Sequence, residues 1–152
     1  MDSIKVILTG ATGMVGEGVL LECLENPNVS EILSVGRKPS GKKHAKLKEY
    51  IVSDFLKIDL LDENLKGYDA VFFCAGISSV GLNEEDYTRI TYDTTLHFAK
   101  AVLNQNPDIV FNYVSGASTD KTESGKQMWA RVKGKTENTL RKLGFRSEYN
   151  FR

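Results

Sequence analysis

The chain has 152 residues, with 20 lysines and arginines balanced by 20 aspartates and glutamates, so its formal net charge is zero. This length suits one hydrophobic core, and the balanced charge argues against a broad face for nucleic acid or for a membrane surface. No apolar run approaches the roughly 20 residues that cross a bilayer, and the first residues lack the features of a signal peptide. The two cysteines show no metal-ligand or redox spacing. We therefore expect a single cytoplasmic domain over residues 1–152, without a nucleic-acid or membrane partner.

Apolar runs of strand length alternate along the chain with segments of helical periodicity. The expected strands are 4–9, 31–35, 50–53, 68–75, 109–114 and 145–151. The expected helices are 14–24, 83–105, which Asn83 or Glu84 opens, and 126–143, which Gly144 closes. Residues 41–48 are expected to form a solvated loop or a short helix. This order predicts an α/β three-layer Rossmann fold with a doubly wound parallel sheet of about six strands, whose carboxyl ends share one ligand-binding edge.

A glycine-rich turn is expected between the first strand and the first helix. Its sequence is Thr9-Gly10-Ala11-Thr12-Gly13-Met14-Val15-Gly16. Gly10 permits a tight turn, Gly13 allows the backbone to approach a diphosphate, and Gly16 lets the helix lie close to the sheet. The backbone N–H groups at the helix start then face the phosphates. This context predicts a dinucleotide site, with a purely structural turn as the alternative.

The residues after the second expected strand bear on cofactor choice. A carboxylate there binds the ribose 2′-hydroxyl of NAD, whereas the 2′-phosphate of NADP requires a cation. This chain has Gly36-Arg37-Lys38 at that point. Arg37 offers a planar fork for a phosphate and Lys38 offers a second charge, so NADP is the expected cofactor and NAD the alternative. A solvated basic loop without a ligand is the competing interpretation.

These features resemble the short-chain dehydrogenase/reductase superfamily, in its extended or atypical branch that includes the nucleoside-diphosphate-sugar epimerases. The glycine pattern from Thr9 to Gly16 matches that branch. The resemblance implies that Asp54 contacts the adenine and that the turn Cys74-Ala75-Gly76 passes under the adenine ribose. It also implies a catalytic serine in the segment 113–118, at Ser115 or Ser118.

The family's Tyr-x-x-x-Lys pair is only half present. Lys133 is in place to bind the nicotinamide ribose, but Trp129 occupies the tyrosine position. An indole N–H donates a hydrogen bond and does not exchange a proton at useful pH. Thr91 similarly replaces the family's asparagine. A tyrosine from elsewhere in the chain could approach the nicotinamide instead. Three candidates are Tyr87, Tyr92 and Tyr113, and the sequence gives no positional argument for any one of them.

Members of the family continue past the sixth strand into a segment that closes over the substrate. This sequence ends at Arg152, so we expect that segment to be absent. If the chain naturally ends there, the substrate pocket is open or is completed by a partner; if the sequence is truncated, the missing part determines the substrate specificity. An exposed sheet edge would favour pairing with another chain, which suggests a homo-oligomer.

Two functions follow from these features. The first is an NAD(P)-dependent oxidoreductase or epimerase-like enzyme, acting on a small carbonyl, alcohol or nucleotide-sugar substrate beside Ser115 and Lys133. The second is a non-catalytic module that senses NADP(H) and regulates an unknown protein partner, as the tryptophan at position 129 would permit. His44 and His97 stand alone in the sequence, so no metal site is expected.

Overall fold

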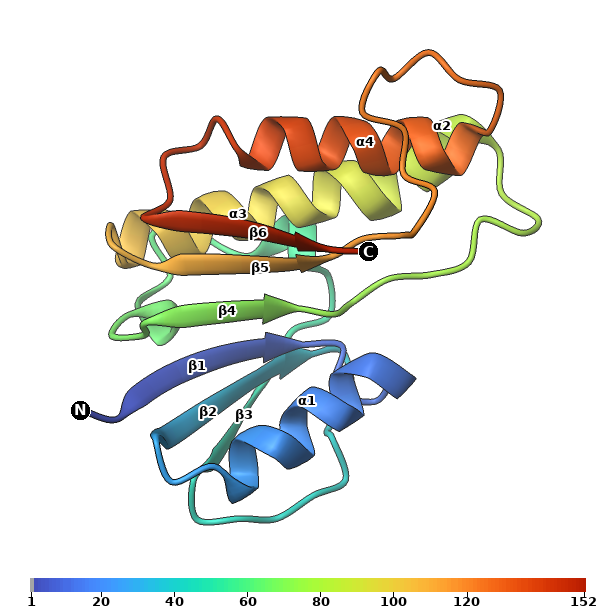
Figure 1. Ribbon diagram of the computed structural model, residues 1–152. Coiled ribbons are helices and arrows are strands. Elements are labelled where there is room, and N and C mark those ends of the chain that lie inside the picture. Colours follow the sequence, from blue (N-terminus) through green and yellow to red (C-terminus); the bar gives the residue numbers. More distant parts are fainter. Residues whose placement is uncertain (1) are drawn as a thin grey trace.

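The computed structural model describes residues 2–152 and contains one six-stranded parallel sheet (Figure 1). Its strands are β1 (Ile4–Thr9), β2 (Val29–Gly36), β3 (Leu47–Ile51), β4 (Ala70–Phe73), β5 (Val110–Val114) and β6 (Ser147–Phe151). They lie in the order β3-β2-β1-β4-β5-β6, and every neighbouring pair is parallel. The doubly wound sheet is therefore confirmed. Residue 1, the first of the predicted domain, lies outside the described residues.

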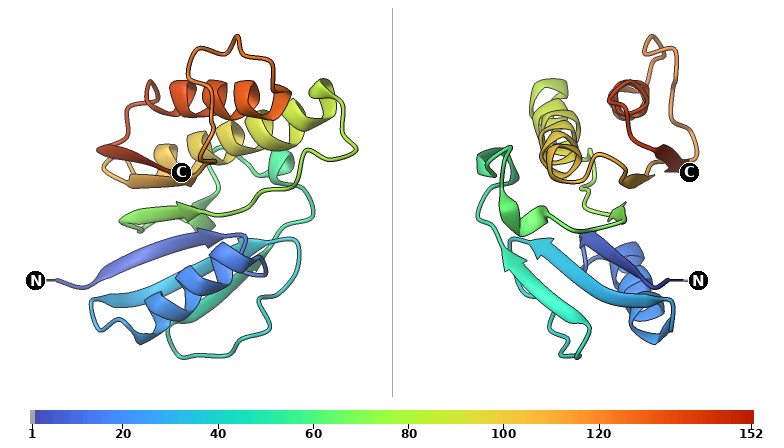
Figure 2. Two further views of the ribbon diagram at one scale, coloured as in Figure 1. Left: turned by 45° about the vertical axis from the view of Figure 1, so that its right-hand side comes forward. Right: turned by 90° about the vertical axis from the view of Figure 1, so that its left-hand side faces the viewer.

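Helices cover both faces of the sheet and give the expected three layers (Figure 2). The helices are α1 (Met14–Glu25), α2 (Glu84–Thr88), α3 (Thr94–Gln105) and α4 (Met128–Leu140). Two short 3-10 turns, η1 (Phe55–Lys57) and η2 (Glu63–Leu65), lie between β3 and β4. Helix α1 packs on one face, while α3 and α4 pack on the other. Within the described residues, the helices are too short or too polar to span a membrane.

Two apolar clusters hold these layers together. Successive side chains of a strand point to opposite faces, so Val6 and Leu8 of β1 pack in the cluster beneath α1, while Ile7 joins the cluster beneath α3. The larger cluster includes Phe73 and Phe98, whose ring centroids are 5.7 Å apart. Burial on both faces explains why the central strands appear in the sequence as continuous apolar runs.

The expected helix 83–105 is interrupted. Asn83 caps α2, its side chain accepting a hydrogen bond from the backbone N–H of Asp86 at 2.8 Å, as expected for the start of this helix. A turn of π-helix, η3 (Arg89–Asp93), then separates α2 from α3. The polypeptide stays helical throughout, so the periodicity is kept while one turn is widened.

The third strand begins earlier than expected. The sequence predicted 50–53, whereas β3 runs from Leu47 to Ile51. Lys48 and Glu49 are exposed on this edge strand, so the apolar pattern that marks the buried strands is missing there. The last two residues of the expected loop 41–48 consequently belong to the strand.

Candidate functional site

The glycine turn after β1 packs directly against the turn after β4. Gly10 has a φ of 77°, and a Cβ added to it would lie 2.6 Å from the backbone nitrogen of Ala75. A Cβ on Gly16 would lie 1.9 Å from the carbonyl oxygen of Gly10. Both positions therefore require glycine for the fold itself, because no side chain fits between the two backbones.

Gly13 is different because its surroundings are open. A Cβ there would meet only the Gly10 oxygen, at 3.5 Å, which is ordinary contact. Gly13 is the N-cap of α1, and no side chain caps the helix start. Thr12 and Val15 are exposed, and Met14 is 91% exposed. The backbone N–H groups of this first turn thus face open space with the positive end of the helix dipole, which suits a diphosphate.

The turn after β4 supplies the second wall of this site. The Cys74 N–H donates to the Thr9 carbonyl and the Ala75 N–H donates to the Thr9 hydroxyl, both at 3.2 Å. Gly76 follows and is exposed. Burial raises the pKa of the Cys74 thiol to about 11, so this cysteine is a neutral packing group at physiological pH. The three residues of this turn therefore lie beside the glycine turn.

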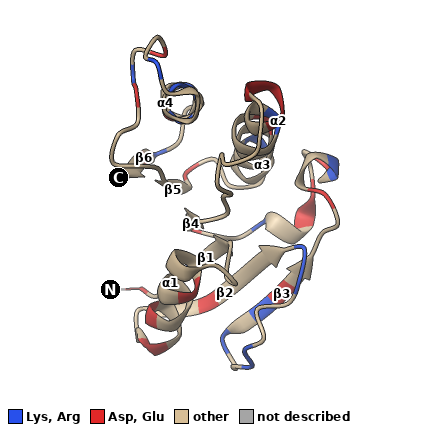
Figure 3. Cartoon of the chain, turned by 90° about the vertical axis from the view of Figure 1, so that its right-hand side faces the viewer, with Lys and Arg blue, Asp and Glu red and all other residues tan. Residues whose placement is uncertain are grey.

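The end of β2 presents two free cations to the same edge. Arg37 and Lys38 are exposed and form no ion pair within residues 2–152. Figure 3 faces this edge and shows basic residues along the segment that joins β2 to β3. Other members of that segment are engaged: Lys42 pairs with Glu17 at 3.1 Å. Arg37 and Lys38 are therefore available to an anionic ligand.

Lys46 was expected in a solvated basic run, and the structure gives it a structural role. Its ammonium group donates to the carbonyl oxygens of Leu24 and Asn26, at 3.0 and 2.8 Å. These carbonyls lie at the end of α1, where the backbone lacks helical partners and the helix dipole is negative. Lys46 is 20 or more residues from both carbonyls in the sequence, and hydrophobic periodicity does not detect a contact over that distance.

Asp54 lies directly after the third strand region and caps η1. Its side chain accepts a hydrogen bond from the Leu56 N–H at 2.9 Å. The carboxylate is half-buried and fixed at the strand edge by this bond. The adenine contact implied by the family resemblance stays a prediction.

Ser115 and Trp129 come together at the end of β5. The Ser115 hydroxyl lies 2.9 Å from the Thr119 hydroxyl, and its N–H donates to the Phe151 carbonyl of β6 at 2.7 Å. The Trp129 ring, from the first turn of α4, packs on Gly116. Ser118 lies on the exposed loop beyond. The geometry thus favours Ser115 over Ser118 as the serine beside the tryptophan position.

Lys133 lies one helical turn after Trp129, on the side of α4 that faces β5. Its ammonium nitrogen is 5.7 Å from the centroid of the Tyr113 ring. Burial lowers its pKa, and the negative charge of Glu137 opposes that effect. Residues four apart share a helix face, so Trp129 and Lys133 are presented together towards the strand.

The three tyrosines considered as substitutes for the missing one are all otherwise engaged. Tyr87 and Tyr113 are each 2% exposed, and burial raises the pKa of both phenols. The Tyr92 hydroxyl lies 3.2 Å from that of Thr139, and Lys135 lies over its ring. Thr91 is buried in the π-turn. The phenols of Tyr87 and Tyr113 are therefore inaccessible to a substrate, whereas Tyr92 is half-buried and its hydroxyl contacts Thr139.

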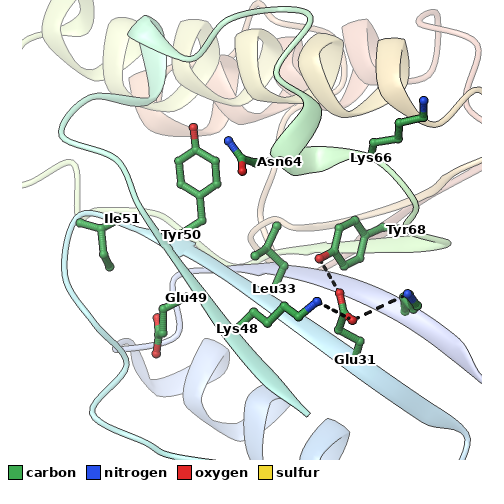
Figure 4. A pocket seen from close by; sticks show the side chains of 10 residues that line it. Glu31, Leu33, Lys48, Glu49, Tyr50, Ile51, Asn64, Lys66 and Tyr68 are labelled. Carbon is green, nitrogen blue, oxygen red and sulfur yellow. Dashed lines mark hydrogen bonds and ion pairs between the residues drawn. The ribbon is translucent and has the colours of Figure 1, made fainter. Parts of the chain in front are cut away.

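A separate cavity of about 840 Å³ lies over the first half of β2 and its neighbours (Figure 4). Glu31 accepts a hydrogen bond from the Tyr68 hydroxyl at 2.8 Å and pairs with Lys48 at 2.9 Å and Lys5 at 3.7 Å. The hydrogen bond from Lys48 lowers the pKa of this carboxyl most strongly. The charges of Lys5 and Lys48 in this cavity are compensated by Glu31, and the lining follows β3 from Lys48 to Ile51. Among residues 2–152, no cluster of three histidines, cysteines or carboxylates is arranged to hold a metal.

The parallel sheet with an open, glycine-rich helix start defines the class of Rossmann-type nucleotide-binding proteins. The model of the NAD dependent epimerase/dehydratase family matches residues 6–124, and the chain belongs to this family. The matched region contains the glycine turn, Arg37 and Ser115, while Trp129 and Lys133 lie beyond it. Membership supports an NAD(P)-binding, oxidoreductase-like function and confirms the resemblance stated above.

Two curated relatives are similar over nearly the whole chain. The chain is 28% identical to protein fmp52, mitochondrial, of Emericella nidulans over an alignment of 148 residues, with 93% of the chain and 62% of that protein covered. It is 26% identical to protein HTATIP2 of Rattus norvegicus, covering 95% of the chain and 60% of the relative. The chain thus spans about three fifths of the length of these relatives.

Solved structures share the fold. One is the UDP-N-acetylglucosamine 4-epimerase of Methanobrevibacter ruminantium M1 in complex with UDP-N-acetylmuramic acid, with a TM-score of 0.72 and 21% identity over 94% of this chain and 51% of the other. A second is the UDP-glucuronic acid 4-epimerase of Bacillus cereus in complex with NAD, with a TM-score of 0.72 and 16% identity over 96% and 55%. At these identities the likeness establishes the fold.

Proposed function

We propose that this chain binds NADP(H) at the carboxyl edge of its sheet. The observation that carries the proposal is the open start of α1, where Gly13 has no side-chain cap and no neighbour that would exclude a ligand. A diphosphate there accepts hydrogen bonds from the N–H groups of the first helical turn. The turns that begin at Gly10 and Cys74 form its walls, and the fold forces them together.

The preference for NADP(H) over NAD(H) rests on Arg37 and Lys38. Both follow β2 directly and both are free of ion pairs within the described residues. A guanidinium group binds a phosphate in a bidentate manner, and a lysine adds a point charge. The 2′-phosphate of NADP would lie at this position, with the adenine towards Asp54.

The reaction we propose is hydride transfer with a small carbonyl, alcohol or nucleotide-sugar substrate, for which the bound nicotinamide supplies or accepts the hydride. Lys133 would hold the nicotinamide ribose through its ammonium group, which faces β5. The Ser115 hydroxyl would donate to the substrate oxygen. Trp129 donates a hydrogen bond without exchanging a proton, so a bound water or another proton donor must take the place of the tyrosine.

A non-catalytic NADP(H) sensor that regulates a protein partner is the second candidate. It is favoured by Trp129 at the position of the family's acid/base, together with the burial of Tyr87 and Tyr113. Loss of the proton-transfer group with the ribose-binding Lys133 kept is the pattern expected of a module that binds nucleotide without turnover.

Titration with NADPH and NADH, followed through the fluorescence of the only tryptophan, tests the proposal. We expect saturable quenching of Trp129, with NADPH binding about tenfold more tightly than NADH, which corresponds to 1.4 kcal/mol. If calorimetry with NADP⁺, NADPH, NAD⁺ and NADH gives no heat, the proposal is wrong.

A second experiment separates the enzyme from the sensor. NADPH oxidation is measured against a panel of carbonyl substrates for the wild type and for Trp129→Tyr. Turnover by the wild type eliminates the sensor. Silence in both proteins, with nucleotide binding intact, supports it.

A further inference from the structure

Helix α4 carries a carboxylate that is buried completely. The side chain of Glu137 is 0% exposed, and it accepts hydrogen bonds from Nε and Nη2 of Arg152 at 3.2 and 2.7 Å. Arg141, one turn further along the helix, approaches the same carboxylate at 3.8 Å. Burying a carboxylate is costly unless it is paired and hydrogen-bonded, so this arrangement is specific rather than incidental.

The ion pair joins the two elements that carry the candidate reactive groups. Arg152 directly follows Phe151 of β6, and the Phe151 carbonyl accepts the hydrogen bond from the Ser115 N–H at 2.7 Å. Glu137 lies one helical turn after Lys133 on α4. The contacts therefore run without a break from Ser115 through β6 to Arg152, and through Glu137 to the helix that bears Lys133.

The charged groups around Glu137 determine its ionisation, and Glu137 in turn affects Lys133. Burial alone would raise its pKa, but the hydrogen bonds from Arg152 and the charges of Arg152 and Arg141 hold the pKa below its usual value. The carboxylate is thus charged at neutral pH. Burial lowers the pKa of Lys133, and the negative charge of Glu137 opposes part of that decrease.

Strands β5 and β6 contribute two further titratable groups near Glu137 and Lys133. Tyr113 of β5 faces Lys133, and burial keeps that phenol neutral. Glu148 of β6 lies 3.9 Å from Arg141 and near the Glu137 carboxylate, and burial raises the pKa of Glu148. Glu137 is therefore the carboxylate of this cluster that lies on α4 itself, one helical turn from Lys133.

We propose that Glu137 is a positioning residue, whose buried carboxylate, clasped by Arg152, fixes Lys133 of α4 and Ser115 of β5 in one geometry and supports the charge of Lys133. The inference rests on the proposed function in so far as Lys133 binds the nicotinamide ribose. It extends that function to a carboxylate which does not itself touch the ligand.

The test measures the ionisation of Lys133 directly and in the absence of nucleotide. The ¹³Cε chemical shift of Lys133, assigned with Lys133→Arg, is titrated in the wild type, Glu137→Gln and Glu137→Asp. The control is Glu123→Gln, which removes an exposed carboxylate that also contacts α4, through Asn138 at 3.0 Å. Affinity for NADPH is measured over the same pH range by quenching of Trp129.

We expect Glu137→Gln to lower the pKa of Lys133 by about one unit, because the negative charge of Glu137 counters the effect of burial on that ammonium group. Affinity for NADPH should then fall at a correspondingly lower pH, with Glu137→Asp intermediate and Glu123→Gln unchanged. A merely structural glutamate would lower the melting temperature and leave the titration of Lys133 where it was.

The two proposals fail in different ways. An unchanged Lys133 titration in a folded Glu137→Gln protein overturns the role of Glu137, whatever the nucleotide does. Should Glu137→Gln not fold, an unchanged Lys133 titration in Glu137→Asp has the same meaning. A shifted titration without binding of any nucleotide overturns the proposed function and leaves the coupling between Glu137 and Lys133 established.

Discussion

The indole ring of Trp129 lies on the backbone of Gly116, so closely that a Cβ added to Gly116 would be 3.0 Å from Cζ3 of the ring. This contact joins the first turn of α4 to the turn that follows β5. It places the tryptophan beside Ser115, where the family resemblance expects a tyrosine. The ring is therefore both a packing group and a neighbour of the candidate site.

The first prediction concerns that contact. Gly116→Ala forces the Trp129 ring to move by a few tenths of an ångström, and we expect a loss of stability of about 1–3 kcal/mol. Thermal unfolding and the emission maximum of Trp129 measure it. Gly18→Ala is the matched control, because Gly18 has open space around its added Cβ, and this helix substitution should stabilise by roughly 0.5–1 kcal/mol. An unaltered emission spectrum in Gly116→Ala would show that the contact is looser than described.

The second prediction separates the ligand-binding glycine from the structural ones. Gly13→Ala leaves ordinary contacts, so the protein should fold normally while its affinity for NADPH drops about tenfold or more, or 1.4 kcal/mol. Gly16→Ala drives a Cβ into the Gly10 carbonyl and should cost about 3 kcal/mol or more of stability. Calorimetric titration and thermal unfolding of both variants give the answer. Equal nucleotide affinity in the wild type and Gly13→Ala would argue that the glycine is architectural.

The third prediction concerns cofactor selectivity. Arg37→Ala removes a charged partner of the 2′-phosphate, and a charge-assisted hydrogen bond contributes about 1.5–3 kcal/mol. NADPH should therefore bind roughly 10- to 100-fold more weakly, while the affinity for NADH changes little. Lys100→Ala on the exposed face of α3 serves as the charge-matched control. A similar loss of affinity for NADPH and NADH would mean that Arg37 contacts the diphosphate, or attracts both anionic nucleotides, without recognising the 2′-phosphate.

The fourth prediction uses the buried carboxyl of β6. Burial raises the pKa of Glu148, and its Oε1 atom has no hydrogen-bond partner among the described residues. Because the folded-state pKa lies above the unfolded value, the ionised form destabilises the fold above the folded pKa, and this penalty disappears below the unfolded pKa. Glu148→Gln should thus raise the melting temperature at pH 8 and give no gain near pH 4. A lower melting temperature at pH 8 would mean that the ion pair with Arg141, at 3.9 Å, outweighs burial.

Much of the fold could be read from the sequence because its central strands are buried on both faces. The expected strand 4–9 coincides with β1, and the expected start of the first helix at Met14 coincides with that of α1. The left-handed glycine expected after the last helix is present at Gly144, with a φ of 96°. These elements are determined by local periodicity and by backbone chemistry, which sequence patterns report well.

Other features depend on contacts between distant residues. Glu137 is an ordinary helix-forming residue in the sequence, and nothing near it indicates burial; its partner Arg152 comes 15 positions later and from another element. The edge strand β3 lacks the apolar run of its neighbours. The preference for Ser115 over Ser118 likewise required the packing of Trp129 against Gly116.

The strand order β3-β2-β1-β4-β5-β6 gives the two ends of the proposed ligand to different halves of the chain. Residues before β4 would hold the adenine, its 2′-phosphate and one side of the diphosphate, the turn directly after β4 would form the other wall, and Lys133 of α4 would hold the nicotinamide ribose. The halves meet in the sheet where β1 pairs with β4. A bound dinucleotide would therefore contact both halves and link them across the β1–β4 pairing. At saturation, the amide protons of both halves should exchange more slowly and as a single cooperative unit.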